Sequence, residues 1–229
     1  VSWCGCIGLK PSRGRVSAGP QVDEGCFGLS MNFAQTRTMR DTAALLDCLS
    51  VPQAGDPFRI PAPDEGFMAW LNRKPEKLRI AWTTAPTMDA PVDAEVAAAV
   101  EATARQLEDM GHLVEQADLV FDQEAASRMM CAIWFFGFHK TLDKIGSKVG
   151  RVPGPDNLEP VTWEIYKRAR DMDPYEFLDG LAWINQSRRE IGRFFARYDV
   201  LLSPATAQVS QPHGLYGLNL PGVSPEDYM

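Results

Sequence analysis

The sequence lacks any hydrophobic run long enough to cross a membrane. A transmembrane helix needs about 20 consecutive apolar residues, and the longest apolar run here, residues 129–138, is about half that length. No charged segment followed by an apolar one marks a secretory leader. The chain starts with Val1, a start typical of the interior of a longer protein. We therefore expect no association with membranes and a cytoplasmic location.

Motifs for metals and nucleotides are also missing. The five cysteines form no CxxC pair, and the only close pair, Cys4 and Cys6, has no second pair to complete a zinc site. No HExxH, P-loop or GxGxxG motif occurs. We expect no metal and no cofactor. The cysteines are interpreted as small buried apolar residues in a reducing compartment.

The composition is that of a globular protein with an acidic balance. The 229 residues are 45% hydrophobic and 23% charged, which excludes a disordered chain. The formal net charge is −7, and the isoelectric point is near 5.0. Binding to nucleic acid generally needs a basic face. We therefore expect no nucleic-acid partner.

Hydrophobic periodicity predicts a strand–helix–strand unit between residues 78 and 117. Residues 78–83 alternate as a strand, and 94–110 repeat apolar side chains every three or four positions as a helix. Asp93 is placed to cap that helix and Gly111 to end it. Residues 112–117 form the second strand. The two strands of such a unit should be parallel.

Helix-capping residues, together with proline and glycine residues that end helices and strands, predict further elements. The predicted strands are 6–10, 15–17 and 199–203, and the predicted helices are 38–50, 122–146, 163–171 and 173–197. Thr38 followed by Asp41, and Asp173 followed by Pro174, mark two helix starts. These elements together predict an α/β fold.

The residues alone do not reveal the chemistry. His112 and His139 are interpreted as solvated or partly buried side chains, and His213 lies in an irregular tail. The aromatic residues between 134 and 138 suit a buried helix or the wall of an apolar pocket. Residues 167–170, KRAR, suit a solvated helix face. No nucleophile–base pair can be chosen from this list.

Three segments resemble the amidase signature family. Residues 2–17, SWCGCIGLKPSRGRVS, follow the family pattern CGxxGLKPSxGRVS. Residues 37–47, RTMRDTAALLD, resemble its RTVRDxALLLD helix, and residues 199–204, DVLLSP, resemble its DVLLxPT strand end. All three occur in family order. Residues 163–169, WEIYKRA, are most similar to the branch of 6-aminohexanoate cyclic-dimer hydrolases.

The resemblance implies an α/β/α layered amidase signature fold around a mixed central sheet. It also implies hydrolysis of a carboxylic amide, small and linear or cyclic, by a Ser–cis-Ser–Lys triad. In that family the lysine takes a proton, through a bridging serine, from the nucleophilic serine, which attacks the carbonyl to form an acyl-enzyme. Backbone amides hold the oxyanion. This chemistry needs neither metal nor cofactor.

None of the three catalytic residues is matched in this chain. In the family the nucleophile stands about five residues before the position of Val1, and the other two lie further upstream. Ser2 and Lys10 match non-catalytic positions of the pattern. We therefore expect no catalytic residue here, and interpret residues 1–229 as one partial amidase domain, incomplete at both ends and inactive alone.

The resemblance also indicates which residues border the substrate. Cys131, Trp134 and Phe135 match a region that borders the substrate in the cyclic-dimer branch. Gly5, Gly8 and Gly14 would allow the backbone to pass closely behind the nucleophile strand. Residues 30–36 depart from the family pattern, which leaves the substrate preference open.

Two other functions fit the same resemblance. One is a glutaminase subunit of a tRNA-dependent amidotransferase, and the other is a non-catalytic amidase-like domain. The expected partner is a small-molecule amide, and a homodimer is left open. Exposed sheet edges and apolar faces of a partial domain would make the isolated chain poorly soluble.

Overall fold

The strand–helix–strand unit expected from the sequence is present in the computed structural model, which describes residues 1–20, 22, 24–85, 91–120, 122–217, 219 and 222–224. Strand β3 (Arg79–Trp82) leads into helix α3 (Ala94–Asp109), and strand β4 (Leu113–Gln116) follows. β3 and β4 are parallel, with Arg79 opposite Leu113. Gly111 has a φ of 96°, the left-handed conformation expected at this helix end. The prediction for this segment is confirmed.

A third strand completes the described sheet of this region. Strand β5 (Val200–Leu202) pairs in parallel with β3, which gives the strand order β4-β3-β5. β3 is therefore the central strand, and its Ile80 and Ala81 are almost completely buried. Helix α3 packs on β3 and β4 through one face, on which Val100 and Ala104 are buried.

The cap of α3 differs from the prediction. Asp93 is the N-cap residue, but its side chain makes no capping hydrogen bond to the helix. Instead its Oδ2 accepts a hydrogen bond of 3.0 Å from the backbone N–H of Val209. Asp93 therefore holds the segment that follows β5 against the start of the helix, a role that no local sequence signal indicates.

The long helix predicted at 122–146 is two helices. Helix α4 (Gln123–Phe135) ends before Gly137, and helix α5 (Phe138–Val149) begins after it. Gly137 has a φ of 74°, outside the helical region, which ends one helix and starts the next. The start was predicted correctly, since Asp122 accepts a hydrogen bond of 2.9 Å from the N–H of Ala125.

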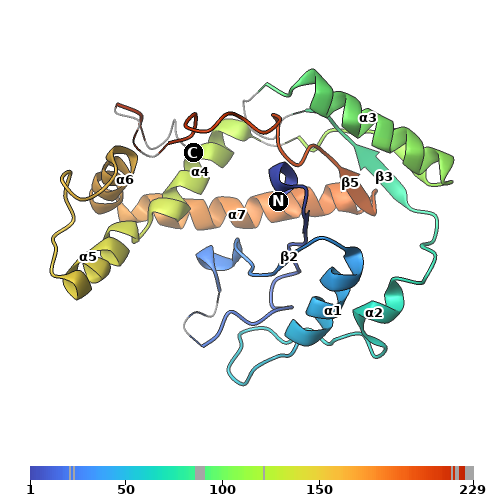
Figure 1. The fold of residues 1–229 in the computed structure, drawn as a ribbon, viewed down its shortest axis with the longest axis horizontal. Coiled ribbons are helices and arrows are strands. Elements are labelled where there is room, and N and C mark those ends of the chain that lie inside the picture. The colour runs from blue at the N-terminus through green and yellow to red at the C-terminus, as the bar shows by residue number, and fades with distance from the viewer. Residues whose placement is uncertain are drawn as a thin grey trace. The chain divides into compact units, whose positions relative to one another are not determined.

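Two further helices follow in the same region. Helix α6 (Pro160–Arg170) starts slightly earlier than predicted, and helix α7 (Pro174–Phe195) runs as expected. Asp173 and Glu176 form the complete capping box at the start of α7. Helix α4 packs against α7 (Figure 1), and Gly180 of α7 allows the close approach, because a Cβ atom there would lie 3.1 Å from Ile133 Cγ1.

The residues up to Lys77 form a compact unit of their own. Strand β1 (Ile7–Gly8) pairs antiparallel with strand β2 (Gln35–Thr36), and short 3₁₀ turns cover Ser2–Cys4 and Cys26–Gly28. β1 was predicted over a longer range. A strand at 15–17 was also predicted, but Arg15 and Val16 lie in a bend and Ser17 belongs to no helix or strand. β2 was not predicted.

Two helices belong to this first unit. Helix α1 (Met39–Leu49) begins as predicted, with the Thr38 hydroxyl accepting a 3.0 Å hydrogen bond from the N–H of Asp41. Helix α2 (Gly66–Trp70) was not predicted. The Asp47 carboxylate accepts hydrogen bonds from the N–H groups of Phe67 and Met68, at 2.5 and 3.0 Å. A charged side chain distant in sequence therefore caps a very short helix.

The second unit comprises Leu78–Met229 and contains β3 to β5 and α3 to α7. The single domain predicted over 1–229 thus consists of two compact units in the structure, and whether they act as one domain stays a prediction. No helix in the described ranges is long and apolar enough to cross a membrane.

Candidate functional site

The three residues predicted to border the substrate lie at the end of helix α4, but they do not share one face. Cys131 and Phe135 are one helical turn apart and are 5% and 2% exposed. They pack with Ala169 and Met172 in a buried cluster that also contacts Phe138 and Ile165. Trp134 is 50% exposed. The structure therefore brings Cys131 and Phe135 together and separates Trp134 from them.

Helix α6 contributes the buried Ala169 to this cluster. The Tyr166 hydroxyl donates a hydrogen bond of 2.9 Å to Asp143 of α5. That hydrogen bond, together with burial, raises the pKa of Tyr166. On the other side, Arg168 forms an ion pair of 2.6 Å with Glu176 of α7. Arg168, in the segment predicted as a solvated basic face, thus ties α6 to α7, and Tyr166, just before that segment, ties α6 to α5.

His139 lies close to this part of the molecule. Its Nδ1 atom is buried and has no hydrogen-bond partner among the described residues. The imidazole ring meets the ring of Tyr166 edge-on, with 6.4 Å between ring centres. The prediction of a partly buried histidine is confirmed. The packing of the ring against an aromatic side chain accounts for its position.

In the first unit, polar side chains of residues 2–17 form hydrogen bonds to other parts of that unit. Arg13 donates a 3.0 Å hydrogen bond to the carbonyl of Gly28, and Arg15 donates one of 2.7 Å to the carbonyl of Pro61. Ser17 donates to Asp56 at 2.7 Å, and this bond is the main cause of the lowered pKa of Asp56.

The glycines of that segment differ in what they allow. At Gly14, φ is 76° and a Cβ atom would lie 2.5 Å from the Cβ of Phe58, so only glycine fits. A Cβ at Gly8 would meet the side chain of Val1 at 2.9 Å, whereas at Gly5 nothing lies within 4 Å. Gly14 and Gly8 therefore each pack closely against a side chain and Gly5 does not. Close passage of these glycines behind the nucleophile strand stays a prediction.

The cysteines are less buried than predicted. Cys131 is buried, but Cys4 and Cys48 are exposed, and Cys6 and Cys26 are intermediate. In the described ranges, no group of three or more His, Cys, Asp or Glu side chains is placed to hold a metal ion.

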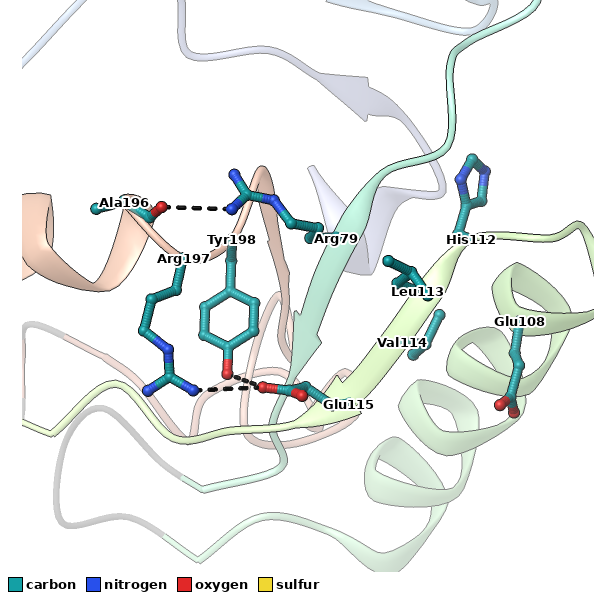
Figure 2. A pocket seen from close by; sticks show the side chains of 9 residues that line it. All are labelled: Arg79, Glu108, His112, Leu113, Val114, Glu115, Ala196, Arg197 and Tyr198. Carbon is teal, nitrogen blue, oxygen red and sulfur yellow. Dashed lines mark hydrogen bonds and ion pairs between the residues drawn. The ribbon is translucent and has the colours of Figure 1, made fainter.

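Sequence reasoning missed a cavity of about 560 Å³ in the second unit. It lies beside β4, which is an edge strand of the described sheet, and extends from the end of α3 to the end of α7. Figure 2 shows the side chains that line it: Arg79, Glu108, His112, Leu113, Val114, Glu115, Ala196, Arg197 and Tyr198. These residues come from three separate stretches of sequence, so no local motif marks the cavity.

Figure 2 shows Arg197, Tyr198 and Glu115 linked by an ion pair and a hydrogen bond. The Tyr198 hydroxyl donates a hydrogen bond to Glu115, and this raises the pKa of Tyr198. Arg197 lies 3.7 Å from the same carboxylate and 5.3 Å from the centre of the Tyr198 ring. The cavity therefore has a polar side in which one carboxylate is shared by a phenol and a guanidinium.

Arg79 and Asp199 form a second charged pair at the start of the strands. The guanidinium of Arg79 reaches both carboxylate oxygens of Asp199, at 2.7 and 3.2 Å, and the backbone N–H of Arg79 donates to the same group at 2.8 Å. These hydrogen bonds lower the pKa of Asp199 to about 2. Arg79 is thus committed to holding β3 beside the start of β5.

Comparison with known proteins assigns the sequence of this chain to a family. A family model described as Amidase matches residues 1–218. A 6-aminohexanoate-cyclic-dimer hydrolase of Pseudomonas sp. (strain NK87) is 30% identical over 214 residues, which are 91% of this chain and 43% of that protein. A putative amidase of Synechocystis sp. is 30% identical over 205 residues, 89% of this chain and 37% of that protein.

Solved structures agree with the sequence matches. The structure of a 6-aminohexanoate cyclic dimer hydrolase complexed with substrate has a TM-score of 0.84 and 29% identity, and covers 94% of this chain and 46% of that one. A bacterial aryl acylamidase, 20% identical, shares the fold with a TM-score of 0.77. The predicted α/β amidase signature fold is confirmed. The chain spans less than half the length of these proteins.

Proposed function

Because this chain belongs to the amidase family, we propose that the protein of which it forms part hydrolyses a small carboxylic amide, linear or cyclic. The observation that carries the proposal is the family match over residues 1–218, together with about 30% identity to two cyclic-dimer hydrolases across roughly nine-tenths of the chain. The 0.84 TM-score of the cyclic-dimer hydrolase structure supports the same assignment.

The proposed reaction follows the triad that the family resemblance implies. A serine attacks the amide carbonyl, the C–N bond breaks, and the amine leaves with a proton. Water then attacks the acyl-enzyme and releases the carboxylic acid. Backbone amides would stabilise the oxyanion at both steps. Neither Ser2 nor Lys10 matches a triad position, so we propose that the 229-residue chain by itself carries out none of these steps.

We further propose that Cys131, Trp134 and Phe135 contribute to the wall of the substrate pocket. Cys131 and Phe135 are held by the cluster that contains Ala169 and Met172, which gives them fixed positions. Trp134, at 50% exposure, offers a large apolar surface. A homodimer and a cytoplasmic location stay predictions, and light scattering on the purified protein tests the first of them.

The test of the function uses two proteins. The polypeptide encoded by the whole gene should hydrolyse a panel of small linear and cyclic amides, with release of the carboxylic acid followed by mass spectrometry. The 229-residue chain, purified without contaminating amidase, should hydrolyse none of them. Inactivity of the whole gene product on every amide would contradict the assignment. Turnover by the 229-residue chain would contradict the proposed absence of the triad.

For the pocket wall, the variant Cys131→Ser in the whole gene product should change KM more than kcat. Conversion of Cys131 to serine retains the size of the side chain, so the fold should persist, and circular dichroism checks this. Cys48→Ser, at an exposed cysteine of α1, is the matched control. Equal kinetics of the two variants would remove Cys131 from the proposed wall.

A further inference from the structure

Two cysteines stand one residue apart near the start of the chain, in the sequence Cys4-Gly5-Cys6. Both side chains carry free thiols, and Cys4 is exposed while Cys6 is partly exposed. Cys6 falls at a position that the family pattern CGxxGLKPSxGRVS leaves variable. The pattern therefore does not account for the second thiol of the pair.

The backbone around Gly5 holds the two cysteines close together. Cys4 ends the short 3₁₀ turn, and Gly5 follows it with a φ of 62° and a ψ of 28°, a left-handed helical conformation. The N–H groups of Cys4 and Cys6 both donate to the carbonyl oxygen of Val1, at 3.0 and 3.2 Å. Helical angles at the middle residue place the two flanking Cα atoms about 5.5 Å apart. This separation lies within the range of about 4.4–6.8 Å that a disulfide bond spans.

The side chain of Cys6 already turns back towards Cys4. Its Sγ–H group donates a hydrogen bond of 3.5 Å to the carbonyl oxygen of Cys4. Because Cys4 is exposed, its side chain can rotate between staggered positions to meet the Cys6 sulfur. Formation of a bond between the two sulfur atoms therefore needs a side-chain rotation and no large movement of the backbone.

We propose that Cys4 and Cys6 form a thiol–disulfide site that reacts with small disulfides such as oxidised glutathione. The thiolate of Cys4 attacks one sulfur of the small disulfide, whose S–S bond breaks, and one small thiol leaves. The thiolate of Cys6 then attacks Sγ of Cys4 and displaces the second small thiol. Two electrons and two protons pass from the cysteines to the small disulfide, and the reverse reaction restores both thiols. The inference goes beyond the proposed amide hydrolysis and does not depend on it.

The experiment exposes the folded 229-residue chain to oxidised glutathione, then blocks the remaining thiols and measures the tryptic peptides by mass spectrometry. Residues 1–13 form one peptide that contains Cys4, Cys6 and no other cysteine. We expect this peptide to lose two hydrogen atoms and to retain no glutathione. Glutathione retained on this peptide, or free thiols in it once the exposed Cys48 has reacted, would overturn the proposal.

Two cysteines without a close partner provide the matched controls. In Cys6→Ser the second attack is impossible, so Cys4 should retain one glutathione. Cys48 is also exposed and has no other cysteine within four residues in the sequence, so it should retain one glutathione in the parent. If Cys6→Ser released glutathione from Cys4 as the parent does, Cys6 would not be the attacking partner and the site would be refuted.

Gly5→Val tests whether the turn holds the pair. A Cβ atom at Gly5 would have no described heavy atom within 4 Å, so the variant adds only the cost of the left-handed conformation. An extended backbone would separate the flanking Cα atoms by about 6.6 Å, near the upper limit for a disulfide. Ring closure from the mixed disulfide should therefore slow about tenfold.

Gly55→Val is the matched control for the backbone. Gly55 also has a positive φ and no described heavy atom within 4 Å of a Cβ, and it lies far from the cysteine pair in sequence. This variant should close the ring as fast as the parent, and circular dichroism checks that both variants fold. Equal closure rates in Gly5→Val and Gly55→Val would show that the turn does not hold the pair, and would overturn the proposed site.

Discussion

The close contact between α4 and α7 predicts opposite effects of the same substitution at two glycines of one helix. Glycine in a helix interior costs roughly 1 kcal/mol relative to alanine. Gly→Ala should therefore stabilise α7 wherever a methyl group fits. At Gly192 a Cβ atom would have no heavy atom within 4 Å. At Gly180 it would lie 3.1 Å from Ile133 Cγ1 and 3.4 Å from the carbonyl oxygen of Met129.

Whether Gly180→Ala destabilises depends on how far Ile133 can move. Ile133 is 1% exposed and is one of the two largest fully buried side chains among the described residues. Close packing on all sides leaves it little freedom, and an inserted methyl in such a core costs about 1–3 kcal/mol. After the gain in helix propensity, Gly180→Ala should lower the free energy of unfolding by up to about 2 kcal/mol. Gly192→Ala should raise it by about 0.5–1 kcal/mol.

Thermal unfolding of the 229-residue chain, followed by circular dichroism, measures both effects. For a protein of this size, 1 kcal/mol corresponds to about 2–4 °C in Tm. We expect Gly192→Ala to unfold a few degrees above the parent and Gly180→Ala to unfold below it. If both variants gained the same stability, α7 would have room at Gly180, and the packing of α4 on it would be wrong.

Three further predictions concern single polar groups. The pKa of Asp199 is lowered to about 2. Its pairing with Arg79 therefore stabilises the fold above the unfolded pKa of about 3.9, and this stabilisation is lost as the pH falls towards 2. In acid unfolding titrations, the free energy of unfolding of Asp199→Asn should depend less on pH between 4 and 2 than that of the parent. Asp122→Ala removes the α4 cap and should cost about 1 kcal/mol in urea unfolding, and a cost near zero would contradict the capping bond. Tyr166→Phe removes the hydrogen bond to Asp143 and should cost about 1 kcal/mol, whereas Tyr175→Phe, at a 72% exposed tyrosine, should cost nothing measurable.

Elements with a strong local signal could be predicted from the sequence. The unit from β3 to β4 followed from alternation, periodicity and Gly111, and the starts of α1, α4 and α7 followed from Thr38, Asp122 and Asp173. In each case neighbours in sequence supply the decisive interaction, either a side chain that caps the next turn or apolar residues that share one face.

Features that depend on distant residues could not be predicted. Helix α2 is capped by Asp47, which lies 20 residues away from Phe67. Strand β2 exists because Gln35 and Thr36 pair with β1, and a stretch of two residues is too short to show the alternation that marks a strand in sequence. The break at Gly137 was missed because glycine within a helical pattern is tolerated in some contexts and ends the helix in others.

The candidate site shows the same division. Cys131, Trp134 and Phe135 were proposed from a family resemblance, and their spacing alone could not show that Cys131 and Phe135 are buried while Trp134 is half exposed. The cavity beside β4 combines Arg79 with residues 108–115 and 196–198, which only the parallel pairing of the strands brings together.

The position of the proposed pocket wall depends on the helix contacts that the first prediction tests. Ile133, which packs on Gly180, lies between Cys131 and Phe135 in sequence, and all three belong to the same continuous helix, α4. A shift of α4 away from α7 would therefore move Cys131 and Phe135 against Ala169 and Met172. If the wall proposal is correct, Gly180→Ala in the whole gene product should alter KM for larger amides more than for smaller ones. Gly192→Ala should alter neither, because it adds a methyl group where nothing is displaced.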